Sequence, residues 1–134
     1  MKAYVKKVQL KTPSEDFIDI TNQVIQIIEE SDIKNGHCVV YCPHTTAGIT
    51  VNENADPDVV TDMLFALDKI YPNYPEFRHF EENSPAHLKS STVGPQQTFI
   101  INDGNILLGM WQGIYFCEFD GPRSRDVIIS VLGV

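Results

Sequence analysis

Trp111-Gln-Gly-Ile-Tyr-Phe-Cys-Glu-Phe-Asp-Gly-Pro-Arg-Ser-Arg125 joins an apolar segment to a dense group of charged side chains. The segment alternates imperfectly between aliphatic and aromatic residues, which is typical of a largely buried strand, yet it contains Glu118. A Gly-Pro turn follows directly, flanked by Asp120, Arg123 and Arg125. One end of a buried strand therefore carries two carboxylates and two guanidinium groups, and we expect a functional site there.

Apolar alternation and turn residues predict the other strands of the chain. They are expected over residues 3–10, 16–20, 37–42, 49–53, 98–101, 106–111 and 127–132. Pro13 and Ser14 lie between the first two of these segments, so we expect the two strands to form a hairpin. Asp103-Gly104 is a strong hairpin signal between two of the later strands.

Two helices are expected between the early strands, and a short third one later. Thr21 is the expected N-cap of the first helix, which Asn35-Gly36 ends. Asp56 is the expected N-cap of the second, with Pro57 at its first position. Its expected buried stripe consists of Val59, Val60, Met63, Leu64, Leu67 and Ile70. A short helix over residues 86–91 is expected within an otherwise irregular segment.

These elements predict one α+β domain over residues 1–134, with a mainly antiparallel sheet of about seven strands and two helices packed on one face. The other face of the sheet must then meet water or another subunit. The residues expected on that face are Phe99, Ile101, Leu107, Tyr115 and Phe119. They are too apolar for free solvent, so we expect self-association, and a ring with cyclic symmetry is the simplest closed arrangement.

Composition limits the functions open to this chain of 134 residues, which is 43% apolar and 21% charged. No apolar run approaches the ~18 residues that span a bilayer, and the N-terminus lacks the apolar core of a secretory signal. We therefore expect a cytoplasmic protein without a membrane partner. A net charge of −8 disfavours nucleic-acid binding but not a small phosphorylated ligand. Three cysteines without a CxxC pair agree with a reducing compartment.

Three of the four histidines lie in polar loops and are candidate metal ligands. His44 follows a strand directly, and His79 and His87 lie eight residues apart in the irregular segment. Three neutral imidazoles with an open coordination position are the ligand set of a catalytic zinc ion. The alternative is three unrelated histidines with separate hydrogen bonds. His37 is expected to be a cap or surface residue.

Three carboxylates could serve beside these histidines: Glu53, Glu118 and Asp120. A metal-binding histidine usually donates its other N–H to a carboxylate or carbonyl, and a carboxylate can also transfer a proton. For Glu53 and Asp120, helix capping and turn stabilisation are equal alternatives. Glu118 lies between two apolar residues, so simple solvation explains it less well.

Several cationic and hydroxyl side chains could hold phosphate oxygens. Arg123 and Arg125 could form a fork, helped by Lys89 and the hydroxyl group of Ser90. Thr45 begins a Thr-Thr-Ala-Gly segment that could offer hydroxyl and backbone N–H groups to an anion. Solvated charges that protect an edge strand are the alternative for either arginine. GxxxxGK[ST], GxGxxG and HExxH patterns do not occur.

Taken in order, the sequence segments discussed above resemble those of the YjbQ-type family of secondary thiamine-phosphate synthases. The matching blocks are Pro43-His44-Thr45-Thr46-Ala47-Gly48-Ile49-Thr50-Val51-Asn52-Glu53, Asp56-Pro57-Asp58-Val59, Arg78-His79, Ala86-His87-Leu88-Lys89-Ser90-Ser91, Gly94-Pro95, and Leu108-Gly109-Met110-Trp111-Gln112-Gly113-Ile114-Tyr115-Phe116-Cys117-Glu118-Phe119-Asp120-Gly121-Pro122-Arg123. They are collinear over nearly the whole chain.

The resemblance implies a trimer of α+β subunits and a metal-associated histidine cluster, here His44, His79 and His87. It also implies a reaction that joins hydroxymethylpyrimidine diphosphate to thiazole phosphate and releases diphosphate, as a side activity. Zinc is the expected metal, and magnesium suits a diphosphate substrate. Arg123 and Lys89 would then hold phosphate oxygens. A metal-dependent hydrolase and a non-catalytic metal-binding or ligand-binding trimer stay open as alternatives.

Overall fold

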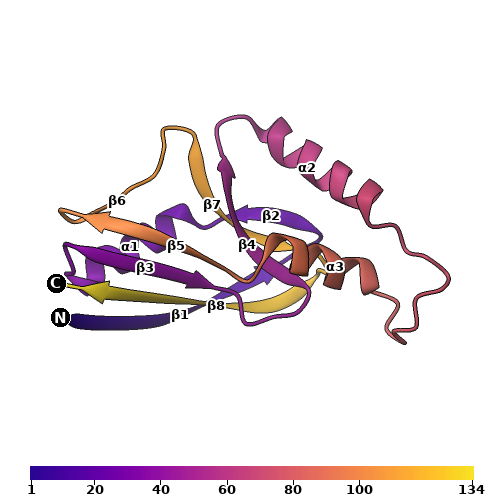
Figure 1. Cartoon of the computed structure of the whole chain (residues 1–134), viewed down its shortest axis with the longest axis horizontal. Helices are drawn as coiled ribbons and strands as arrows, with labels where there is room; N and C mark the ends of the chain where they lie inside the picture. The colour runs from indigo at the N-terminus through magenta and orange to yellow at the C-terminus, as the bar shows by residue number, and fades with distance from the viewer.

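The computed structural model describes residues 1–134 and contains eight strands and three helices (Figure 1). In chain order they are β1 (Lys2–Thr12), β2 (Asp16–Asp19), α1 (Thr21–Ser31), β3 (Gly36–Tyr41), β4 (Ala47–Glu53), α2 (Pro57–Ile70), α3 (Ser84–Val93), β5 (Gln96–Asn102), β6 (Asn105–Ile106), β7 (Gln112–Glu118) and β8 (Arg123–Gly133). The α+β class is confirmed. The termini lie side by side at one end of the molecule, and α2 and α3 lie toward the other.

The strands form two antiparallel sheets rather than one sheet of about seven strands. The larger sheet has the order β1-β8-β3-β5-β6, and the smaller has the order β2-β7-β4. The expected hairpin of the first two strands is wrong, because β1 pairs with β8 and β2 pairs with β7. The chain passes from the larger sheet to the smaller one at residues 13–15. In its own sheet each of the two strands pairs with a strand from the C-terminal part of the chain. A local turn signal cannot reveal such a distant partner.

The later hairpin is confirmed, although its second strand is short. Asn102 pairs with Asn105 across the turn, where Asp103 and Gly104 both have positive φ, at 51° and 82°. That conformation is the reason for the Asp-Gly sequence. The expected strand over 106–111 is wrong beyond Ile106, because residues 107–111 form no strand, although the Leu107 amide still donates to the Ile100 carbonyl at 2.9 Å.

The helices begin close to the expected residues but differ in burial. The carboxylate of Asp56 accepts from the Asp58 amide at 2.9 Å, which confirms the N-cap of α2. The expected cap and end of α1 are wrong: Ile20 rather than Thr21 is its N-cap, and the helix ends before Asp32, which adopts a left-handed conformation. The predicted buried stripe of α2 is only half-buried, and Ile70 is exposed. The inner side chains of the helix pack against a buried cluster that includes Phe17 and Tyr115.

Two apolar clusters hold the fold together. The larger has 17 buried residues from α1 and both sheets, and the smaller consists of Phe17, Ala86, Tyr115, Cys117 and Phe119. The expectation of an uncovered apolar face is therefore wrong for Phe99, Ile101, Tyr115 and Phe119, which the second sheet and the helices bury. Leu107 alone of that set is exposed. None of the three helices has the length and apolar composition needed to cross a membrane.

The three cysteines are buried and unpaired. Burial raises the pKa of the Cys38 thiol to about 12 and raises that of Cys42 as well. Both residues therefore stay protonated at neutral pH and act as small core residues.

Candidate functional site

A polar cavity of about 390 Å³ brings together segments that are far apart in the sequence. It is lined by Pro43, His44, Thr45, Thr46, His79, Glu81, Asn83, His87, Arg123 and Arg125, and none of these is hydrophobic. They come from the β3–β4 loop, the α2–α3 segment, the first turns of α3 and the start of β8. The structure thus places the three predicted histidines on one cavity, together with both predicted arginines.

His79 and His87 are the closest pair of these histidines. Their ring centres are 5.1 Å apart and their planes are perpendicular. Two imidazoles bound to one tetrahedral zinc ion through bonds of about 2.1 Å would have their ring centres about 5 Å apart. The spacing of this pair therefore suits two ligands of one metal ion. The Glu81 carboxylate lies 3.9 Å from His79 Nε2.

His44 is held differently, because its Nε2 accepts a hydrogen bond from the Asp126 amide at 2.8 Å. That bond uses the Nε2 lone pair, so the proton of the neutral ring is on Nδ1. Burial lowers the pKa of His44, and the charge of Arg125 lowers it further. At neutral pH His44 is therefore a neutral ring that presents an N–H, not a lone pair.

The predicted metal site fits this arrangement in part. No three His, Cys, Asp or Glu side chains lie close enough together to hold an ion as they stand. His79 and His87 have suitable spacing, whereas His44 would first have to release the Asp126 amide. The donor chemistry suits zinc, and two of the three predicted ligands have compatible geometry.

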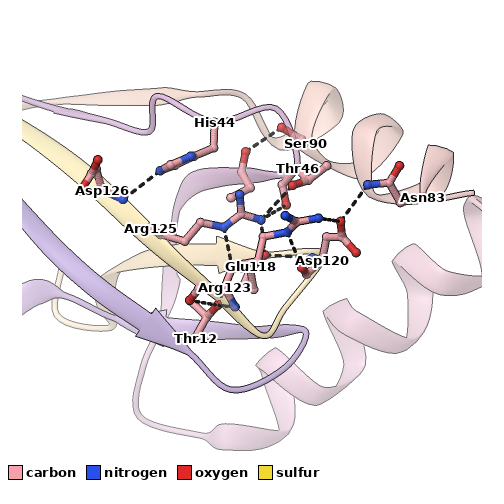
Figure 2. Close-up of polar contacts among 11 residues, drawn as sticks. Thr12, His44, Thr46, Asn83, Ser90, Glu118, Asp120, Arg123, Arg125 and Asp126 are labelled. Atoms are coloured by element: carbon pink, nitrogen blue, oxygen red, sulfur yellow. Dashed lines mark hydrogen bonds and ion pairs between the residues drawn. The ribbon is translucent and has the colours of Figure 1, made fainter. Parts of the chain in front are cut away.

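Behind the cavity lies a buried network centred on Glu118, whose side chain is fully buried (Figure 2). Arg125 donates from Nε to Glu118 Oε1 at 2.7 Å and from Nη2 to Oε2. Thr12 donates to the same carboxylate at 2.6 Å, and the Asp120 amide donates at 2.9 Å. Burial alone would raise the pKa of Glu118, but these hydrogen bonds outweigh it and hold the pKa below its ordinary value.

This network ties three segments of the chain to the cavity wall. Arg125 Nη2 also donates to Thr46 Oγ1 at 2.8 Å and so fixes the loop that carries His44. Glu118 does not itself line the cavity. Glu118 orients Arg125 through these hydrogen bonds.

Asp120 orders the rim of the cavity. Its carboxylate accepts from Arg123 Nη2 at 2.7 Å and from Asn83 Nδ2 at 2.8 Å. Burial would raise the pKa of Asp120, but these two bonds outweigh it and lower the pKa. Arg123 is about half exposed and already paired, so its charge is partly neutralised.

Three of the predicted site residues lie away from this cavity. Lys89 donates to Glu15 at 2.7 Å and to Asp68, beside a separate hollow. Ser90 donates to the Ala47 carbonyl at 2.6 Å and fastens α3 to β4. Glu53 accepts from the Asp56 amide at 3.2 Å at the start of α2. Thr45, in contrast, lines the cavity as expected.

The sequence interpretation missed three residues that shape the site: Glu81, Asn83 and Asp126. Thr46 belongs to the Thr-Thr-Ala-Gly segment that was expected to offer hydroxyl groups, and it lines the cavity. Asp126 had no signal in the sequence, because its amide meets His44 across 82 positions of sequence.

The fold and the cavity define a small α+β protein with a polar site of histidines and arginines formed by two loops, α3 and the start of β8. The chain belongs to the YjbQ-like UPF0047 family, whose pattern matches residues 6–134.

Relatives of known sequence and structure are similar over nearly the full length. UPF0047 protein YugU of Bacillus subtilis is 54% identical over 131 residues, which cover 96% of this chain and 99% of the relative. UPF0047 protein MJ1081 of Methanocaldococcus jannaschii is 53% identical, covering 95% and 93%. The structure of a YjbQ/UPF0047 protein from Clostridium acetobutylicum matches with a TM-score of 0.92 and 53% identity, covering 95% and 99%. A YbjQ-like protein of unknown function from Sulfolobus solfataricus matches with a TM-score of 0.95 and 33% identity, covering 99% of each chain.

Proposed function

We propose that this protein is an enzyme acting on small phosphorylated molecules, of the secondary thiamine-phosphate synthase type. The proposed reaction joins hydroxymethylpyrimidine diphosphate to thiazole phosphate and releases diphosphate. One observation carries the proposal: three histidines and two arginines from four distant segments line one polar cavity. Such a lining suits an anionic substrate rather than an apolar one.

The chain's own residues would bind and orient the anion. Arg125 and Arg123 supply positive charge to the cavity, and Thr45 supplies a hydroxyl group. Asp120 keeps Arg123 and Asn83 at the rim, and Glu118 keeps Arg125 in the wall. Glu81 is the carboxylate that lines the cavity, so it is the best-placed group for moving a proton.

A divalent metal is part of this proposal, with zinc first and magnesium as the alternative for a diphosphate substrate. His79 and His87 would hold it, with His44 as a third ligand if its ring leaves the Asp126 amide. When bound, the metal would neutralise charge on the leaving diphosphate.

Paired assays test the reaction and the metal together. We expect purified protein to contain stoichiometric metal and to couple the two substrates, and we expect His79→Ala and His87→Ala to lose both properties. His37→Ala is the matched control, because this exposed histidine lies outside the cavity. Full metal content and turnover in folded His79→Ala would remove that residue from the proposed site.

A second candidate is a metal-dependent hydrolase of small phosphate esters. The cavity has no hydrophobic residue in its lining, so it offers no apolar wall to a pyrimidine or thiazole ring. Hydrolysis of a phosphate-ester panel without coupling activity would favour this second candidate. Metal and phosphate binding without any turnover would indicate a non-catalytic ligand-binding protein.

We also propose that the protein works as a cytoplasmic homotrimer. The exposed apolar side chains available for contact between subunits include Phe65, Ile70, Tyr74, Phe80, Met110 and Trp111. We expect sedimentation equilibrium at micromolar concentration to give three times the mass of the 15.1 kDa chain. A monomer mass under those conditions would contradict the assembly.

A further inference from the structure

Arg125 has an unusual combination of deep burial and an unused donor. Its side chain is 5% exposed and it lines the cavity. Nε and Nη2 donate to Glu118 and Thr46, while Nη1 donates to no protein atom. Asn83 Oδ1 is the one fully buried side-chain polar atom that has no hydrogen-bond partner. Nη1, which also has no partner, must therefore be accessible to solvent. One nitrogen of a largely buried side chain that lines the cavity is thus free to donate.

Two neighbouring groups have free hydrogens as well. Thr46 Oγ1 accepts from Arg125 Nη2, so its own hydrogen is free to donate. His44 Nε2 accepts from the Asp126 amide, so the hydrogen of the neutral ring is on Nδ1. Both residues line the same cavity as Arg125.

We propose that Arg125 Nη1, Thr46 Oγ1 and His44 Nδ1 form a donor cluster that binds a tetrahedral oxyanion such as phosphate without requiring a metal. The inference rests on the proposed function, because it identifies how that site would hold the phosphate of its substrate. It assigns the anchoring role to Arg125 rather than to the exposed Arg123 or to Lys89.

The hydrogen bonds around Arg125 hold its guanidinium group in place before an anion binds. Glu118 lies behind Arg125 and occupies Nε and Nη2, so it fixes the guanidinium while leaving Nη1 free. The donors are ordered before the ligand arrives, which reduces the conformational entropy lost on binding. Glu81 is the carboxylate in the cavity lining, and its side chain is about half exposed, so it competes weakly for the cluster.

Inorganic phosphate, titrated calorimetrically into protein stripped of metal with EDTA, tests the cluster directly. We expect the wild-type protein to bind one phosphate per chain. Arg125→Lys should weaken binding at least about 10-fold, because all three N–H groups of a lysine would be needed to replace the bonds of Arg125 to both Glu118 oxygens and to Thr46, so none is left for the phosphate. Thr46→Val should weaken it about 5-fold through loss of one donor. Arg123→Gln should weaken binding less than Arg125→Lys does, although Arg123 also lines the cavity, because its side chain is about half exposed and already paired at the rim.

Three outcomes would overturn the inference. They are absence of phosphate binding to the metal-free wild-type protein, an Arg123→Gln effect as large as that of Arg125→Lys, and unchanged binding by folded Thr46→Val. If Arg125→Lys does not fold, Thr46→Val decides the question. Phosphate binding in the expected pattern without any catalysis would support the cluster and refute the proposed enzyme. Catalysis without metal-free phosphate binding would do the reverse.

Discussion

Glu118→Gln is expected to lower the free energy of unfolding by about 3–5 kcal/mol at neutral pH. The glutamine has nearly the same shape, but it cannot balance the charge of Arg125, whose side chain is 5% exposed. It also replaces an acceptor of the Thr12 hydroxyl and the Asp120 amide by a group with fewer acceptor sites. Urea unfolding followed by circular dichroism measures the difference.

Asp120→Asn is the matched control for this prediction. Asp120 pairs with Arg123, which is 45% exposed, so solvent screens the interaction. We expect the control to lose no more than about 1 kcal/mol. Equal losses in the two variants would show that the buried network has no special role in stability.

The Glu118 carboxylate also sets part of the acid sensitivity of the protein. The folded-state pKa of Glu118 lies below the ordinary value of 4.5, so its contribution to stability is complete above that value. The contribution is lost as the pH falls through the folded-state pKa. Glu118→Gln should therefore flatten the acid side of the stability profile.

Arg125→Met is expected to lower the free energy of unfolding by a similar amount, about 3–5 kcal/mol at pH 7. The stability of this variant should depend on pH in the opposite direction. Without its partner the buried Glu118 carboxylate is destabilised, so its pKa rises above the unfolded value. A group with a raised folded-state pKa stabilises the protein below the unfolded pKa and loses that contribution as the pH rises. Stability of the variant should therefore increase when the pH is lowered from 7 toward 5, as measured by urea unfolding at each pH.

The double variant Glu118→Gln/Arg125→Met separates the network from its parts. We expect it to be more stable than the sum of the two single losses predicts, because no buried charge is left unpaired. Strictly additive losses would mean that the two side chains act independently, contrary to their hydrogen bonds.

The local elements of this protein were predictable because their causes are local. The Asp56 cap with Pro57 and the Asp103-Gly104 turn depend on residues only a few positions apart. Composition and alternation likewise indicated an antiparallel α+β domain. The strand over 106–111 failed because alternation alone does not ensure a pairing partner.

For the site, the sequence predicted many of the residues but not their contacts. Residue chemistry identified His44, His79, His87, Thr45 and Arg123 as members, and all of them line the cavity. It also grouped Lys89 and Ser90 with them, although α3 turns those two side chains toward Asp68 and Ala47. On a helix of 3.6 residues per turn, Lys89 lies two positions after His87 and so points away from the face that His87 occupies. Ser90 lies nearer that face, but its hydroxyl is used in the hydrogen bond to the Ala47 carbonyl.

The sequence by itself determined the kinds of side chain available and the short-range structure, since these depend on neighbours along the chain. Only the tertiary structure decided what each side chain does. Whether Glu118 meets solvent or Arg125, and whether His44 offers a lone pair or a proton, depends on partners such as Asp126 that lie 82 positions away. Burial and hydrogen bonding set those properties, and both arise from how the two sheets pack together.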